Sequence, residues 1–127
     1  MAQLREIVID SMNPAKLAVF WANALTSYKV RPYSDAEIAR LAAIGLTPET
    51  DPAVAVDGDG PTLFFQKSVD LKTQRNRIHF DICGGVREKE VGRLQTLGAT
   101  VRDVHDNFTV MLDPEGNEFC VVDPRQE

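Results

Sequence analysis

The segment Asp113-Pro114-Glu115-Gly116-Asn117-Glu118-Phe119 constrains the fold more than any other stretch of this chain. Pro114 has a restricted φ, and both Gly116 and Asn117 tolerate a positive φ, so the segment predicts a tight turn. Strand-forming residues stand directly before the turn, at 109–112, and directly after it, at 120–122. The segment therefore predicts a β-hairpin close to the C-terminus.

The order of predicted elements repeats along the chain. A strand ending in Asp10 is followed by a helix that Ser11 or Asn13 can cap, with Pro14 in its first turn. In the second half a strand ending in Asp81 is followed by a helix that Gly98 ends. Each half closes with further strands, so each reads strand, helix, strand, strand, strand. The predicted strands are 7–10, 28–31, 53–56 and 62–67 in the first half, and 78–81, 100–102, 109–112 and 120–122 in the second.

The first half contains one additional element. Ser34 and Glu37 have the spacing of a capping box, and apolar residues continue to a stop at Gly45, which predicts a short extra helix over 34–45. The polar stretch 69–76 is expected to link the halves. We therefore expect a single domain of two βαβββ modules, over about 4–68 and 76–124.

Composition narrows the function classes. With 127 residues, 43% of them hydrophobic and 26% charged, the chain can build one globular core. Its net charge of −5 argues against nucleic acid or an anionic membrane as the main partner. The sequence contains no long apolar run of the kind that would predict a leader or a membrane span. The two cysteines, Cys83 and Cys120, do not have the spacing of a metal-ligand pair. We therefore expect a cytoplasmic protein with reduced thiols.

Two helix-backed sheets predict an α+β fold. We expect each sheet to curve, to carry its helix on one side and to leave a concave face on the other. Two such faces would enclose a cleft, where small-molecule sites tend to lie. Phe64 and Phe65 point to opposite faces of their strand, so one is expected in the cleft and the other in the core.

Several of these segments together resemble the vicinal-oxygen-chelate superfamily, and within it the small glyoxalase-like proteins. They are the paired βαβββ order, the early helix with Asn13-Pro14 and Phe20-Trp21, the strand Arg77–Asp81, the helix end Leu97–Thr100 and the turn Asp113–Phe119. The likeness covers roughly residues 4–124. It implies the glyoxalase/bleomycin resistance/dioxygenase fold, and it makes a homodimer an expectation. One fold hosts many reactions, so the likeness does not name one.

The resemblance also implies where a metal would bind. Metal-dependent members bind a divalent ion through the first and last strands of each half. Carried over position by position, their ligands fall on Glu6, Gln66 (with Phe64 as the alternative), Arg77 and Cys120. An arginine stays protonated and cannot bind a cation, so we expect no metal at these four positions.

Other readings of the same residues stay open. His79 shares a face with Arg77, so Glu6, His79 and Glu118 could instead bind a divalent metal ion. Without a metal, Arg77 suits a carboxylate or phosphate, and His79 with a carboxylate, Glu6 or Glu118, could move protons as a catalytic pair. In the purely structural alternative, Arg77 pairs with Glu6 or Glu118 and no reaction follows.

Three functions are therefore expected as alternatives. The first is a metal-free binding module for a small aromatic or anionic molecule, with ligand contacts from Glu6, Phe64, Gln66, Arg77 and Cys120. The second is a lyase or isomerase of the glyoxalase type that uses either a divalent metal ion or the pair of His79 and a carboxylate. The third is a structural or regulatory dimer with a degenerate cleft.

Overall fold

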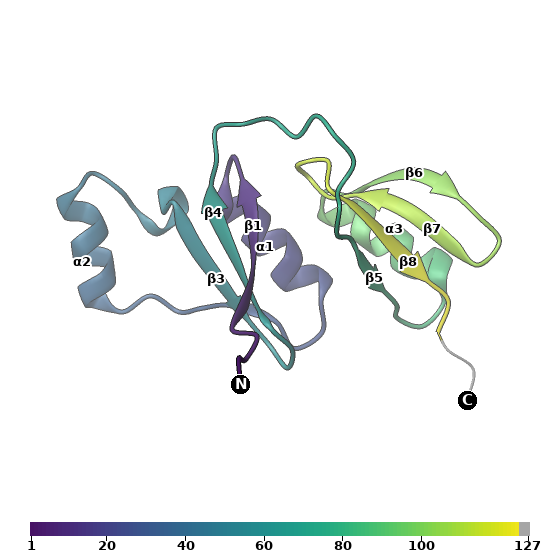
Figure 1. Cartoon of the computed structure of the whole chain (residues 1–127), viewed down its shortest axis with the longest axis horizontal. Coiled ribbons are helices and arrows are strands. Elements are labelled where there is room, and N and C mark those ends of the chain that lie inside the picture. The colour runs from purple at the N-terminus through teal and green to yellow at the C-terminus, as the bar shows by residue number, and fades with distance from the viewer. Residues whose placement is uncertain (125–127) are drawn as a thin grey trace. The chain divides into compact units, whose positions relative to one another are not determined.

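A computed structural model describes residues 1–124. The chain forms two compact units, and the boundary between them in the sequence falls between Leu71 and Lys72. In the first unit one four-stranded sheet has the order β1-β4-β3-β2, with β1 parallel to β4 and the other pairs antiparallel (Figure 1). Its elements are β1 (Glu6–Ser11), α1 (Pro14–Ala24), β2 (Lys29–Val30), α2 (Asp35–Ala43), the 3-10 turn η1 (Pro48–Thr50), β3 (Ala53–Asp57) and β4 (Thr62–Lys67).

The second unit repeats this topology. Its sheet has the order β5-β8-β7-β6, and β5 is again parallel to the last strand while the other pairs are antiparallel. Its elements are β5 (Phe80–Ile82), α3 (Arg87–Leu97), β6 (Thr100–Val104), β7 (Phe108–Leu112) and β8 (Glu118–Val122). The α+β class and the two βαβββ modules that the sequence predicts are confirmed. The cleft predicted from two concave faces stays a prediction.

Helix α1 forms where the sequence places it and supplies the core of the first unit. The side chain of Asn13 caps it by accepting from the Lys16 N–H at 3.3 Å, while the hydroxyl of Ser11 accepts from the Asn13 N–H at 3.0 Å. The rings of Phe20 and Trp21 meet edge to face, with centroids 5.1 Å apart. They are buried with other apolar side chains of α1, β3 and β4, namely Leu17, Ala18, Ala24, Val54, Val56, Leu63 and Phe65. Phe65 is thus the phenylalanine of the core, and Phe64 points to the other face of β4.

Helix α3 buries less apolar surface than α1. Leu94 is its one fully buried side chain, and it belongs to a core that also contains Met111, Phe119 and Val121. Gly98 ends the helix with φ of +119°, a left-handed conformation that favours glycine. Helix α2 has both halves of the predicted capping box but buries only Leu41, and it stands out from the sheet of its unit (Figure 1).

One strand begins later than its sequence predicts. We expected a strand over 78–81, but β5 covers Phe80–Ile82, so Arg77 and His79 precede the strand, and Ile78 is 76% exposed. The cause lies opposite, at the start of β8. The carbonyl of Glu118 accepts from the side-chain amide of Asn76 at 3.5 Å, and its carboxylate accepts from the Asn76 N–H at 2.9 Å. These bonds take the place of strand pairing before Phe80.

The C-terminal hairpin turn depends on one buried carboxylate. Asp113 is 4% exposed and accepts from the Glu115 N–H at 2.9 Å, the Asn117 N–H at 3.0 Å and the Asn117 side-chain amide at 2.8 Å. Gly116 has φ of +84°, whereas Asn117 lies outside the left-handed region. The turn prediction is confirmed, with glycine as the residue that needs a positive φ.

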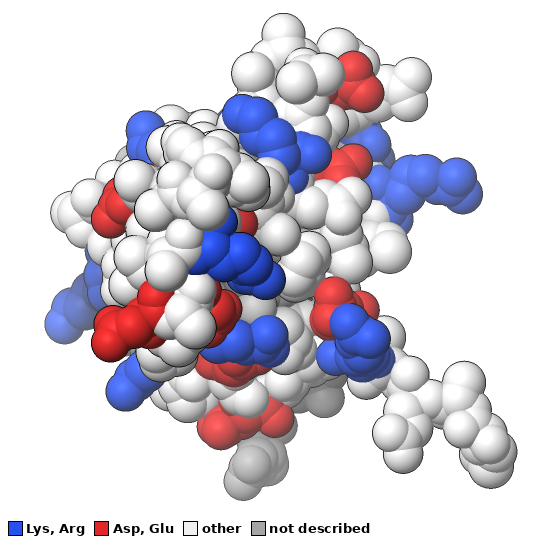
Figure 2. Space-filling model, turned by 90° about the vertical axis from the view of Figure 1, so that its left-hand side faces the viewer, with Lys and Arg blue, Asp and Glu red and all other residues white. Residues whose placement is uncertain are grey.

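Charged side chains of both signs are mixed on the surface. Figure 2 shows lysine and arginine interspersed with aspartate and glutamate on one face of the molecule, without a broad area of one sign. Within residues 1–124, no helix has the length and apolar content that crossing a bilayer requires.

We predict that Asp113→Ala lowers the free energy of unfolding by about 2–3 kcal/mol, because three donors of the turn lose their shared acceptor. Urea unfolding at neutral pH measures this difference. The matched control is Asp103→Ala. The exposed carboxylate of Asp103 pairs with Arg102 at 3.3 Å, and its loss should change the free energy of unfolding by less than about 0.5 kcal/mol. Equal effects of the two substitutions would contradict a structural role of Asp113.

Candidate functional site

The first unit leaves one face of its sheet without a helix. Pairing of β1 with β4 aligns Glu6 with Thr62, Val8 with Phe64 and Asp10 with Gln66, and these side chains point away from the buried Leu63 and Phe65. Val8 is 49% exposed and Phe64 is half-buried. We name this surface, formed by the six aligned side chains, the first open face. It combines an apolar centre with polar ends.

The polar groups of the first open face and its border already have partners. The Gln66 amide donates to Asp10 Oδ1 at 3.0 Å, and Glu6 Oε1 lies 3.1 Å from Arg5 Nε. At the border, the guanidinium of Arg31 donates two hydrogen bonds to Asp57, of 2.8 and 2.9 Å. The bond from Arg31, together with a weaker one from Thr62, lowers the pKa of the Asp57 carboxyl. The polar ends are therefore ordered before any ligand binds.

The helix-free face of the second sheet carries a different group of side chains. The register of β5 and β8 sets Asp81 directly beside Cys120, and His79 lies 3.2 Å away, from its Nε2 to Asp81 Oδ1. One possible ligand atom from each of the three residues lies within 4.8 Å of the others. Burial, followed by the charge and hydrogen bond of Asp81, raises the pKa of the Cys120 thiol. Cys120 is thus poorly suited to act alone as a thiolate nucleophile.

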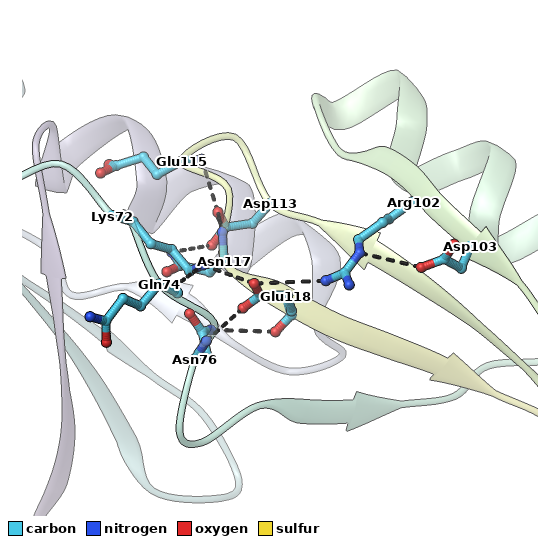
Figure 3. Close-up of polar contacts among 9 residues, drawn as sticks. All are labelled: Lys72, Gln74, Asn76, Arg102, Asp103, Asp113, Glu115, Asn117 and Glu118. Carbon is cyan, nitrogen blue, oxygen red and sulfur yellow. Dashed lines mark hydrogen bonds and ion pairs between the residues drawn. The ribbon is translucent and has the colours of Figure 1, made fainter.

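Glu118 has a structural role in the second unit. Its carboxylate accepts from Lys72 Nζ at 2.8 Å and from the Asn76 N–H at 2.9 Å, and Arg102 Nη1 lies 3.9 Å away (Figure 3). Lys72 also donates to the carbonyl of Gln74 at 2.5 Å. Partial burial alone would raise the pKa of Glu118, but the bonds from Lys72 and the backbone outweigh it and lower that pKa to about 2. Glu118 therefore fastens the segment 72–76 to the start of β8.

The structure separates the proposed catalytic pair. His79 contacts Asp81, whereas Glu118 contacts Lys72 and Asn76, and no hydrogen bond or ion pair joins His79 to Glu118 within the described chain. Arg77 lies in the exposed bend before β5, with no hydrogen bond or ion pair in residues 1–124. The ion pair of Arg77 with Glu118 that the sequence offered as a structural alternative is therefore wrong.

Two residues were missed by the sequence reasoning. Asp81 was expected only as the last residue of a strand, yet it lies between His79 and Cys120 and contacts both. Its place on the same face as His79 follows from the two-residue period of a strand, but its position beside Cys120 depends on the register of two distant strands. Lys72 falls in the stretch that was expected only to link the halves, and no local signal could have paired it with Glu118.

The four positions that the resemblance assigns to a metal do not suit a hard, oxygen-preferring cation. In the first unit Glu6 is a suitable ligand, but Gln66, whose Nε2 donates to Asp10, offers only a neutral amide oxygen. In the second unit Arg77 is a cation and Cys120 has a thiol. Binding at Glu118 would require the loss of its bonds to Lys72 and Asn76.

Comparison with models of known protein families finds a match that covers most of the chain. Residues 6–122 match the model described as a glyoxalase-like domain. A search of curated proteins finds no significant match.

Solved structures support the same fold over nearly the whole chain. The hypothetical protein SA1046 from S. aureus is 16% identical, with a TM-score of 0.65 over 98% of this chain and 95% of that one. A glyoxalase/bleomycin resistance protein/dioxygenase family enzyme from Burkholderia phytofirmans PsJN is 15% identical, with a TM-score of 0.64 over 96% and 98%. The fosfomycin resistance protein FosX from Mesorhizobium loti is 9% identical, with a TM-score of 0.64 over 96% and 91%. At these identities the likeness shows the fold alone.

We predict that Glu118→Gln removes part of the pH dependence of stability. A carboxyl whose pKa is lower in the folded chain than in the unfolded chain stabilises the fold at pH values above its ordinary pKa of 4.5. This stabilisation is lost as the pH falls from 4.5 toward about 2. The variant should be less stable by on the order of 2 kcal/mol at pH 7. Its difference from the unmodified chain should shrink as the pH falls, which urea unfolding at several pH values measures.

The control for this prediction is Glu88→Gln. Glu88 is exposed on α3 and has no ion pair in the described part of the chain. Its substitution should leave the pH profile of stability unchanged. A stability difference for Glu118→Gln that stays constant from pH 7 to acid would contradict the anchoring role of this carboxylate.

Proposed function

This chain belongs to the glyoxalase-like domain family, and we propose that it binds a small aromatic or anionic molecule without the divalent metal used by metal-dependent members. Glu6, Phe64, Gln66, Arg77 and Cys120 remain its proposed ligand-binding residues. A cytoplasmic location and a homodimer are parts of the same proposal. The alternative role, a structural or regulatory dimer, needs no ligand. The binding experiment below distinguishes that role from small-molecule binding.

The observation that carries this proposal is the uncovered apolar centre of the first open face. Phe64 and Val8 are neighbours across β4 and β1, and neither is covered by helix α1 of the same unit. An aromatic ring packed on them would remove their apolar surface from water. The fixed polar groups at either end, Glu6 and the Gln66–Asp10 pair, could orient the ligand by hydrogen bonds.

A second feature favours an anionic group on the ligand. The guanidinium of Arg77 is exposed and has no acidic partner in residues 1–124, so its donors are available to a carboxylate or phosphate. The charges of both signs on the face in Figure 2 favour a small anion over a large polyanion. Two of the similar structures are fosfomycin resistance proteins, so small-molecule recognition is a reasonable use of this fold.

The alternative function, a metal-dependent lyase or isomerase, would use Glu6, His79 and Glu118 as ligands, with His79 and Glu118 as its acid–base pair. It is less well supported because the carboxylate of Glu118 already binds Lys72 and Asn76. A metal would have to replace both partners and also release the segment that they fasten.

We predict that anilinonaphthalene sulfonate, an aromatic anion, binds the folded chain and that Phe64→Ala weakens this binding about tenfold. The physical reason is the loss of the aromatic surface on which the probe packs. Arg77→Gln should weaken binding less, by about two- to fivefold, because an exposed ion pair contributes little. Fluorescence titration measures the affinity, and urea unfolding checks that each variant is folded.

Matched controls come from elsewhere on the first unit. Val19→Ala removes an apolar side chain that is 51% exposed on α1, and Arg40→Gln removes an exposed cation on α2. Neither should change the affinity. Absence of probe binding to the unmodified chain, or equal binding by Phe64→Ala, would overturn the proposed binding face and favour the structural role.

A further inference from the structure

We propose that His79, Asp81 and Cys120 form a zinc site on the helix-free face of the second sheet, with the fourth coordination position left open. All three residues belong to one unit, so the site needs nothing from the first half of the chain. The inference does not depend on the proposed binding of an aromatic or anionic ligand.

The geometry that supports this site comes from strand pairing. Asp81 and Cys120 are opposite residues on the adjacent parallel strands β5 and β8, so their side chains leave the sheet on the same face. His79, two residues before Asp81, brings Nε2 to 3.2 Å from Asp81 Oδ1. The possible ligand atoms of all three lie within 4.8 Å of one another.

These separations are close to what zinc requires. Bonds of about 2.0–2.3 Å in a tetrahedral site put neighbouring ligand atoms about 3.3–3.8 Å apart. The His79–Asp81 distance is already that short, and the widest separation exceeds it by about 1 Å. The side chains of His79 and Asp81 are 45% and 59% exposed, so small changes of rotamer can bring the atoms together.

The ligand types select the metal. A thiolate, an imidazole and a carboxylate together suit zinc and not magnesium or calcium, which require oxygen ligands throughout. Zinc would displace the proton of the Cys120 thiol, forming the sulfur–zinc bond and releasing one proton to water. The resulting two negative charges, on Asp81 and Cys120, balance the charge of the ion. The nearby positive charge of Arg75 favours the thiolate form of Cys120.

This set differs from the positions that metal-dependent relatives imply for this chain. Those positions are Glu6, Gln66, Arg77 and Cys120, drawn from both halves, and the inferred site shares only Cys120 with them. It also omits Glu118, whose carboxylate is held by Lys72 and Asn76. The two kinds of site can therefore be separated by mutation.

The test is a zinc titration of the full, reduced chain in competition with a chromogenic chelator. A second titration uses cobalt as a spectroscopic substitute for zinc. We expect one zinc per chain, release of protons on binding, and a cobalt spectrum with a thiolate charge-transfer band. Cys120→Ser should abolish that band, and both Cys120→Ser and His79→Ala should weaken zinc binding by more than about tenfold. Urea unfolding without metal shows whether each variant is folded.

The chain offers matched controls. Cys83→Ser removes the other cysteine, which is exposed and outside the cluster, and His105→Gln removes the other histidine, which stacks on Phe108. Both should bind zinc and give the cobalt band as the unmodified chain does. No zinc binding by the unmodified chain, binding retained in folded Cys120→Ser, or binding lost in Glu6→Gln would each overturn the proposal.

Discussion

In each half of this chain the first strand pairs in parallel with the last, and the two candidate functional surfaces follow from that pairing. Parallel neighbours cannot be joined by a tight turn, so the chain must leave the sheet and return through a helix. The first crossover includes α1 and the second includes α3, and the fourth strand completes each ladder. A single helix packs on one face of its sheet, which leaves the other face available.

The same topology produces two chemically different faces. In the first unit the pairing of β1 and β4 brings Val8 beside Phe64, and the polar residues at either end have partners of their own. In the second unit the pairing of β5 and β8 brings an aspartate beside a cysteine, with a histidine within reach. The duplicated scaffold therefore supports an apolar surface in one half and, in the other, the three side chains that we propose as zinc ligands.

Glu118 illustrates how a residue that looks functional can be structural. Its residue type and its place on the last strand suggested a metal ligand or a proton carrier. The linker supplies a lysine and a backbone N–H to the same carboxylate, and those bonds hold it in the charged form. A carboxylate held in this way is a weak base, and the bonds of Glu118 to Asn76 take the place of strand pairing before Phe80.

The sequence by itself determined the elements whose causes are local. The cap at Asn13, the capping box at Ser34, the stop at Gly98 and the turn at Asp113 each depend on residues a few positions apart, and all four form as expected. The repeated order of elements, together with the segments that resemble a known superfamily, was sufficient to predict the fold. Only the tertiary structure decided which side chains meet, as with Lys72 and Glu118, or Asp81 and Cys120. The Lys72–Glu118 contact joins a residue outside any strand to the last strand across 46 positions of the sequence. The Asp81–Cys120 contact depends on the register of two strands far apart in the sequence, and because neighbouring residues of a strand point to opposite faces, a shift of one position would exchange these partners.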